Sequence, residues 1–107
     1  MSVIEHVIAA LTAHDLDAFV ACYAEDAKIE EGNDGAVLAH GHEAMRVRYG
    51  ALLAEHPKAR WTVLHRIEAG EFVVQHEEVH GMGIAVVQHV CVYLVRDGLI
   101  HQERVLR

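Results

Sequence analysis

The hydrophobic pattern changes its period within residues 14–31, and this change constrains the fold more than any other feature of the sequence. The first half has apolar residues at the spacing of one helical face: Leu16, Phe19, Val20 and Tyr23. Asp15 precedes them, where a helix N-cap residue belongs. From Ala27 onward apolar and polar residues alternate, as in a strand with one buried face. The segment therefore predicts a short helix that leads directly into a strand.

The alternation places an acid on the apolar side of that strand. Side chains two positions apart point to the same face, so Ala27, Ile29 and Glu31 share one face. Burial in an apolar recess raises the pKa of a carboxyl group and makes it a usable proton carrier near neutral pH. Glu31 is therefore a candidate catalytic residue, with an acid at the solvated end of a strand as the alternative.

The remaining pattern predicts helices first and strands afterwards. Helices are expected over residues 3–13 and 41–55, and a short strand over 36–39. Long strands follow over 60–69, 71–80, 84–95 and 99–106, with turns at Ala69-Gly70, at residues 81–83 and at Asp97-Gly98. Trp61, Val63, His65 and Ile67 are expected on one face. This order predicts an α+β fold, with three N-terminal helices on a curved antiparallel sheet, in a single domain over residues 1–107.

The register of the two central strands decides which side chains meet. A three-residue turn at residues 81–83 would place Gln75 opposite His89, Glu77 opposite Val87 and Val73 opposite Cys91. One face then carries Val73, Gln75, Glu77, His89, Cys91 and Tyr93. The other face carries Phe72, Val74, Val90, Val92 and Leu94, an apolar set that predicts a homodimer formed through the sheet. A slip of one residue would exchange the two faces.

Charge and composition exclude several functions. The net charge of −7 and the absence of a basic run argue against binding to nucleic acid or to anionic membranes. No apolar run is long enough to span a membrane, and the N-terminus lacks a signal-peptide pattern, so we expect a cytoplasmic protein. Cys22 and Cys91 match no metal-binding spacing and are expected to be reduced. His65, His89, Glu77 and Glu31 could converge on a metal, but no metal motif is present, and we expect no metal and no cofactor.

Three segments also resemble a known family. "HDLDAFVACYAEDAKIEEG", "GHEAMRVRYGALL" and "VYLVRDGLI" are similar in content and order to the NTF2-like superfamily, in its SnoaL-like and ketosteroid-isomerase-like branch. The resemblance implies a cone-shaped, cystatin-like fold with a cavity between helices and sheet. It also implies that Val73, Gln75, Glu77 and Cys91 line this cavity. The superfamily includes enzymes and non-catalytic modules, so the resemblance is specific for the fold and weak for the activity.

Matched residue by residue to ketosteroid isomerase, the resemblance places the general base at Glu31. The tyrosine that donates to the oxyanion falls at Val7, and the protonated acid falls at Cys91. Valine donates no hydrogen bond and cysteine donates a weak one, so stabilisation of a dienolate in that manner is not expected. His89, Tyr93 or Tyr23 could supply a substitute donor.

Two functions remain open at this stage. The first is an enzyme of isomerase, lyase or hydrolase type that acts on a small apolar molecule, with Glu31 and His89 as catalytic residues. The second is a non-catalytic homodimer that binds a ligand or serves as a scaffold. For either function, the ligand-binding candidates are Tyr23, Trp61, His65, Val73, Gln75, Glu77, Cys91 and Tyr93.

Overall fold

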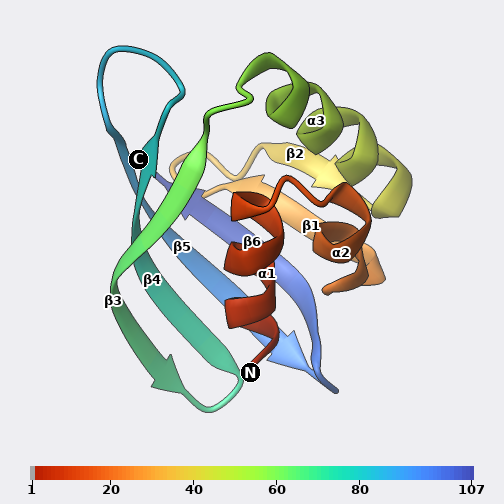
Figure 1. Cartoon of the computed structure of the whole chain (residues 1–107). Helices are drawn as coiled ribbons and strands as arrows, with labels where there is room; N and C mark the ends of the chain where they lie inside the picture. Colours follow the sequence, from red (N-terminus) through yellow and green to blue (C-terminus); the bar gives the residue numbers. More distant parts are fainter. Residues whose placement is uncertain (1) are drawn as a thin grey trace.

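The computed structural model describes residues 2–107, which form three helices and six strands. In chain order these are α1 (Val3–Thr12), α2 (Leu16–Ala21), β1 (Tyr23–Glu31), β2 (Val37–His40), α3 (His42–Glu55), β3 (Arg60–Ala69), β4 (Phe72–His80), β5 (Val87–Arg96) and β6 (Leu99–Leu106). Figure 1 shows all three helices on one side of a curved sheet. The predicted α+β fold, with helices before the long strands, is confirmed.

The first two helices begin at the residues that their capping patterns indicate. The Ser2 hydroxyl accepts a hydrogen bond from the amide of Glu5 at 3.3 Å, and the Asp15 carboxylate accepts one from the amide of Ala18 at 3.1 Å. The second helix is shorter than expected, because Tyr23 opens β1 instead of closing the helical stripe. Its ring still packs on Phe19, with centroids 5.1 Å apart, which explains why it fits the helical spacing.

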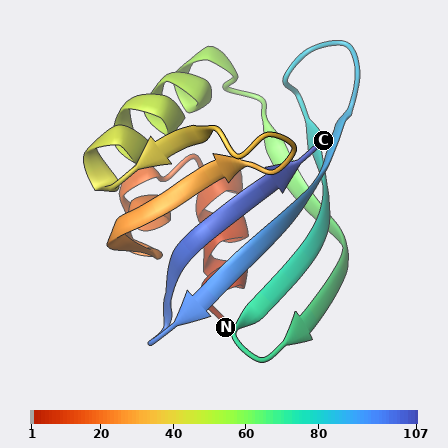
Figure 2. The same cartoon turned by 180° about the vertical axis from the view of Figure 1, so that it is seen from behind.

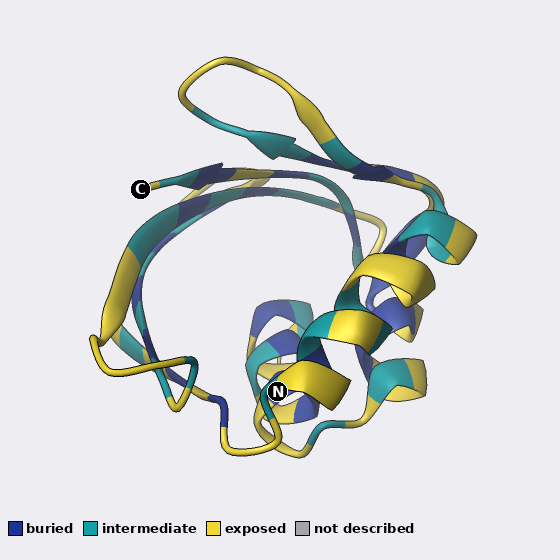
Figure 3. Ribbon diagram, turned by 90° about the horizontal axis from the view of Figure 1, so that it is seen from above, coloured by how far each residue is buried: buried dark blue, intermediate teal, exposed yellow. Residues whose placement is uncertain are grey.

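The strand order is β2-β1-β6-β5-β4-β3, so the last strand of the sequence lies inside the sheet. All neighbours are antiparallel except β1 and β6, which are parallel. The helices cover the concave face, and seen from above the strands curve around them (Figure 3). From behind, the described residues place no helix over the outer face (Figure 2). This arrangement leaves one face of the sheet for a core and a cavity.

The connection between β4 and β5 is longer than predicted. Residues 81–86 join the strands, and Gln75 pairs with Cys91 while Glu77 pairs with His89. The three-residue turn expected at residues 81–83 is therefore wrong, and with it the register. The error is two residues, which moves a side chain along the strand but keeps it on the same face. Gln75, Glu77 and Cys91 are accordingly all buried on the concave side.

A bulge in β3 exchanges the faces of its two halves. Val63 pairs with Glu77, but His65 pairs with His76, so Leu64 is an extra residue in the strand. Trp61 and Val63 therefore share the concave side, whereas His65 lies on the outer face, exposed and stacked on His76. The prediction that one face carries Trp61, Val63, His65 and Ile67 is wrong, because strict alternation was assumed through the bulge.

The core lies between the helices and the concave face. Its fully buried members come from the helices and from every strand except β2 and β3: Ile4, Val7, Phe19, Val20, Tyr23, Ile29, Met45, Val79, Tyr93 and Ile100. On the outer face Phe72 is 51% exposed, and Val74, Val90, Val92 and Leu94 are half-buried. Among the described residues, no helix has the length and apolar character required to cross a bilayer.

Gly81 fixes the position at which the β4–β5 connection leaves the sheet. Its φ is +82°, and a Cβ there would lie 2.2 Å from the carbonyl oxygen of Lys58. Gly70 also has a positive φ, +61°, but a Cβ there would meet nothing within 4 Å. We expect Gly70→Ala to lower the free energy of unfolding by about 1–2 kcal/mol through backbone strain alone. Gly81→Ala should cost about 3 kcal/mol or more, because the backbone must also move.

Urea denaturation of the two variants measures this difference. Equal losses of stability in Gly81→Ala and Gly70→Ala would show that the close approach to Lys58 does not constrain the connection.

Candidate functional site

A cavity of about 220 Å³ lies between the helices and the concave face of the sheet. Its polar lining residues come from β1, α3, β4, β5, β6 and the residue after β6: Tyr23, Arg48, Tyr49, Glu77, His89, Cys91, Tyr93, Glu103 and Arg107. Apolar side chains from the helices and the sheet form the remaining wall. Sites for drug-sized ligands usually measure about 300–1,000 Å³, so this cavity suits a compact molecule.

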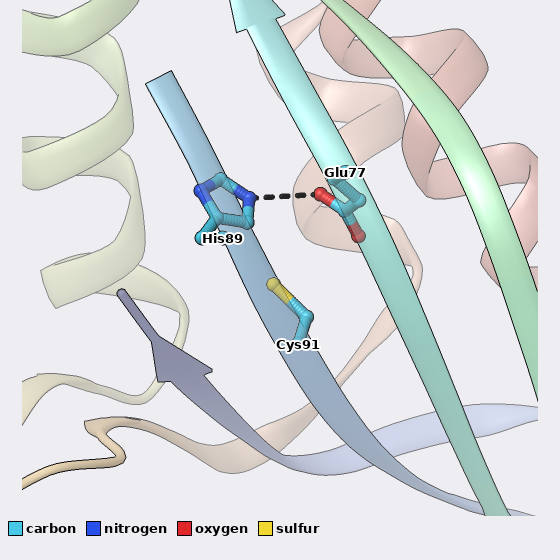
Figure 4. A group of neighbouring side chains, drawn as sticks. All are labelled: Glu77, His89 and Cys91. Carbon is cyan, nitrogen blue, oxygen red and sulfur yellow. Dashed lines mark hydrogen bonds and ion pairs between the residues drawn. The ribbon is translucent and has the colours of Figure 1, made fainter.

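Glu77 is the centre of a hydrogen-bonded group on the cavity wall. Its side chain is buried, and its Oε2 accepts hydrogen bonds from Tyr93 Oη at 2.9 Å and from Gln75 Nε2 at 2.8 Å. Its Oε1 lies 3.0 Å from Nε2 of His89, the contact drawn in Figure 4. These partners satisfy the hydrogen-bonding capacity of a carboxyl group that has been taken out of water. They also fix its orientation.

The same group continues to the surface. Arg66 Nε donates to Gln75 Oε1 at 2.6 Å, and its guanidinium lies 3.5 Å from the Glu5 carboxylate on α1. Gln75 is fully buried behind Glu77 and does not line the cavity itself. Gln75 therefore holds the Glu77 carboxylate in place without lining the cavity.

Glu103 is the second buried acid in the cavity. Its side chain is 5% exposed and accepts a hydrogen bond from the hydroxyl of Tyr23. Burial raises the pKa of Glu103 from its ordinary 4.5 to about 7, and the nearby Glu77 carboxylate adds to this shift while the Tyr23 hydrogen bond opposes it. A carboxyl group with this pKa exists in both protonation states near neutral pH, as a general acid or base requires.

Sequence reasoning missed Glu103 because a bulge in β6 places it on the concave face. Val95 pairs with Ile100 but Leu94 pairs with Gln102, so His101 is the extra residue. Without the bulge, Glu103 would point outward. A signal was present in the apolar pattern. Ile100 and Val105 are five positions apart, an odd spacing that one face of a regular strand cannot hold, and both are buried.

The predicted site residues divide into three groups by position. The cavity is lined by Tyr23, Trp61, Glu77, His89, Cys91 and Tyr93. Val73 and Gln75 are buried on the same face but lie behind the lining. Glu31 and His65 are outside it.

Glu31 stands at the end of β1, half-buried, next to the turn into β2. Its amide donates to the carbonyl of Ala36 at 2.7 Å. The pairing with β6 is unbroken through Ile29 and Glu31, so the two residues share a face as predicted. Glu31 nevertheless does not line the cavity. The buried acids of the cavity come from β4 and β6 instead.

Glu77, His89 and Cys91 are a group that could bind a metal ion, since their ligand atoms lie within 4.8 Å of one another (Figure 4). The chemistry of the thiol disfavours this use. Burial, and then the charges of Glu103 and Glu77, raise the pKa of Cys91 far above its ordinary value. A thiol must lose its proton to bind a metal, and in this environment that loss is costly. The three side chains are better described as part of the hydrogen-bonded cavity wall.

The raised pKa of Glu103 should appear in the pH dependence of stability. Between pH 4.5 and about 7 the folded protein binds one proton more than the unfolded chain, so the free energy of unfolding falls as pH rises. Summed over this window, the fall due to Glu103 is about 3 kcal/mol. Glu103→Gln, which mimics the protonated acid, should lose this part of the slope. Denaturant unfolding at pH 4.5 to 8 tests it, with the exposed Glu68→Gln as the control. Superimposable slopes in both variants would contradict the assignment.

Solved structures share this architecture at low sequence identity. A cystatin-fold protein from Novosphingobium aromaticivorans superposes with a TM-score of 0.91 at 23% identity, covering 100% of this chain and 99% of that one. A putative polyketide cyclase from Sinorhizobium meliloti gives 0.84 at 20% identity, over 96% and 92% of the two chains. A ketosteroid-isomerase-like protein from Catenulispora acidiphila, in complex with trimethylamine, gives 0.80 at 18% identity, over 96% and 82%.

At these identities the likeness shows the fold alone, and it confirms the cystatin-like, NTF2-like architecture. Comparison with proteins of curated function finds no match. Among protein families, the SnoaL-like domain matches residues 4–103. The match spans most of the sequence and agrees with the resemblance found in its motifs, and the chain therefore belongs to the SnoaL-like domain family.

Proposed function

We propose that this protein binds a compact small molecule in the cavity and transfers a proton to or from it through Glu103. The observation that carries the proposal is a single carboxyl group that is buried, lines the cavity and has a pKa of about 7. Such a group can remove a proton from a carbon acid and return it elsewhere on the molecule. The reaction is therefore of the isomerase or lyase type.

The polar side chains beside Glu103 in the cavity lining support this role. Nε2 of His89 lies 3.0 Å from Oε1 of Glu77, and Tyr93 donates to the same Glu77 carboxylate. Glu103 faces Tyr93 across the β5–β6 pair, so the two acids lie on the same face of the sheet, with β5 between their strands. His89, a catalytic candidate from the sequence, keeps that role here as the partner of Glu77.

The catalytic role assigned to Glu31 passes to Glu103. Both are glutamates on strands that flank the cavity, but Glu103 lines it and Glu31 does not. A putative polyketide cyclase of the same fold gives the proposal an analogy and no more.

Ligand binding without catalysis is the second candidate. Val7 and Cys91 stand where the ketosteroid-isomerase-like pattern would place its hydrogen-bond donors, and both line the cavity. An enzyme on this scaffold must therefore stabilise developing negative charge with other groups. If no other group stabilises this charge, the cavity binds a ligand without converting it.

The two candidates separate in a ligand screen followed by mutation. Lactones, epoxides, enones and aromatic acids are tested by thermal shift, since a ligand at 100 times its Kd stabilises by about 2.7 kcal/mol. For a ligand that is turned over, Glu103→Gln should lower kcat about 100-fold or more and leave binding intact, because the amide keeps the shape but cannot transfer the proton. Wild-type kcat/KM should change with an apparent pKa near 7.

Glu31→Gln is the matched control, an identical chemical change outside the cavity, and should retain activity. Full activity in Glu103→Gln would refute the role of that acid. Hits that bind but are never converted would favour the binding module.

We also propose that two copies of the chain pair through the outer face of the sheet. The face formed by Phe72, Val74, Val90, Val92 and Leu94 is apolar, and no helix of the described residues covers it. Exposed apolar patches of this kind commonly mark protein interfaces. A two-fold axis would bring the same patch of each copy together.

Val92→Asp should split this dimer, because it would bury an unpaired charge at the centre of the interface. Light scattering with size-exclusion chromatography measures the mass. Val47→Asp, at a 71% exposed position on α3, is the control and should remain dimeric. A monomeric wild-type protein at the highest soluble concentration would reject the interface.

A further inference from the structure

The mouth of the cavity carries two arginines. Arg48 on α3 and Arg107 after β6 line the cavity, and no other arginine among residues 2–107 does. Neither forms a side-chain hydrogen bond or an ion pair within this part of the chain. Three other arginines do so, among them Arg46, bound to Asp17 at 2.5 Å, and Arg96, bound to Glu71 at 2.9 Å. Arg48 and Arg107 are both exposed, so their donors are available to a ligand that enters the cavity.

Tyr49 lines the same cavity as these arginines and the buried acid. Its ring packs on Phe19, with centroids 4.6 Å apart, and its hydroxyl makes no hydrogen bond within residues 2–107. After the effect of burial, Glu103 and Cys91 raise the pKa of Tyr49, whereas Arg48 and Arg107 lower it. The hydroxyl is thus close enough to both pairs of residues for them to shift its pKa. It adds a third hydrogen-bond donor to those of Arg48 and Arg107 in the cavity lining.

We propose that Arg48, Tyr49 and Arg107 form an anion-binding subsite, and that the ligand is a small carboxylic acid whose apolar body lies toward Glu103. The inference deepens the proposed function and rests on it for the reacting end of the ligand. Guanidinium groups match the geometry of a carboxylate, and a phenolic hydroxyl adds a third donor. Leu38, Leu52 and Met82 supply apolar wall for the body.

The negative charge of the chain gives the two arginines in the cavity lining a specific meaning. At a net charge of −7 the protein repels anions in general, so an anionic ligand needs locally clustered cations. Two buried acids inside the cavity would in turn repel a carboxylate placed beside them. The ligand orientation follows from these two constraints, with the carboxylate at the mouth and the uncharged part inside.

Trp61, the only tryptophan, lines the cavity and reports binding by its fluorescence. The probes are three acids with their matched amides: benzoate and benzamide, cinnamate and cinnamamide, cyclohexanecarboxylate and cyclohexanecarboxamide. We expect at least one acid to bind about tenfold more tightly than its amide, a preference that weakens at high salt.

Arg48→Gln should reduce the preference by about three- to tenfold and leave amide binding unchanged, and Tyr49→Phe should act in the same direction. The control is Arg46→Gln, which removes the same charge from the same helix outside the cavity. Thermal melts of all variants establish that they fold.

The subsite is refuted if no acid binds more tightly than its amide, or if Arg46→Gln weakens the preference as much as Arg48→Gln. Glu103→Gln separates this result from the proposed function. It should preserve or strengthen the preference for the acid, since it removes a negative charge from the cavity. Loss of turnover in Glu103→Gln without any acid preference would retain the function and remove the subsite. A preference for the acid in a protein whose turnover does not depend on Glu103 would retain the subsite and reject the proposed function.

Discussion

An acid that leaves water must find hydrogen-bond partners, and this constraint shapes the concave face of the sheet. Its buried polar side chains are Gln75, Glu77 and Glu103. Each forms a hydrogen bond with a side chain on an adjacent strand. An unpaired group there would cost several kcal/mol. Tyr23 on β1 and Tyr93 on β5 therefore use their hydroxyl groups to hydrogen-bond the two acids. These pairs form part of the cavity wall.

Local patterns in the sequence were sufficient for the order of helices and strands, but not for the parallel pairing of β1 with β6. Asp15 marks the start of α2, and Asp97-Gly98 marks the turn between β5 and β6. The faces of β4 and β5 were predicted although the connection between them was misjudged, because the error was an even number of residues. Alternation within a strand is a local property, and it survives uncertainty about loop length.

Bulges limited the prediction of the site. One extra residue at Leu64 carries His65 to the outer face, and another at His101 carries Glu103 to the inner face. A bulge is set by how neighbouring strands pair and curve, which a single strand read in isolation does not reveal. The family resemblance pointed to an acid on β1, whereas the buried acid Glu103, which lines the cavity, is on the neighbouring strand β6.

The parallel pairing of β1 with β6 has a consequence for how the protein matures. Tyr23 and its partner Glu103 are eighty residues apart in the sequence, and the strand that carries the acid follows the other five strands in sequence order. It lies between the strands on either side of it, so the two parts of the sheet cannot join until it docks. Such distant contacts form late and slowly. The carboxyl group of Glu103 is therefore buried against Tyr23 only after β6 has taken its place between β1 and β5.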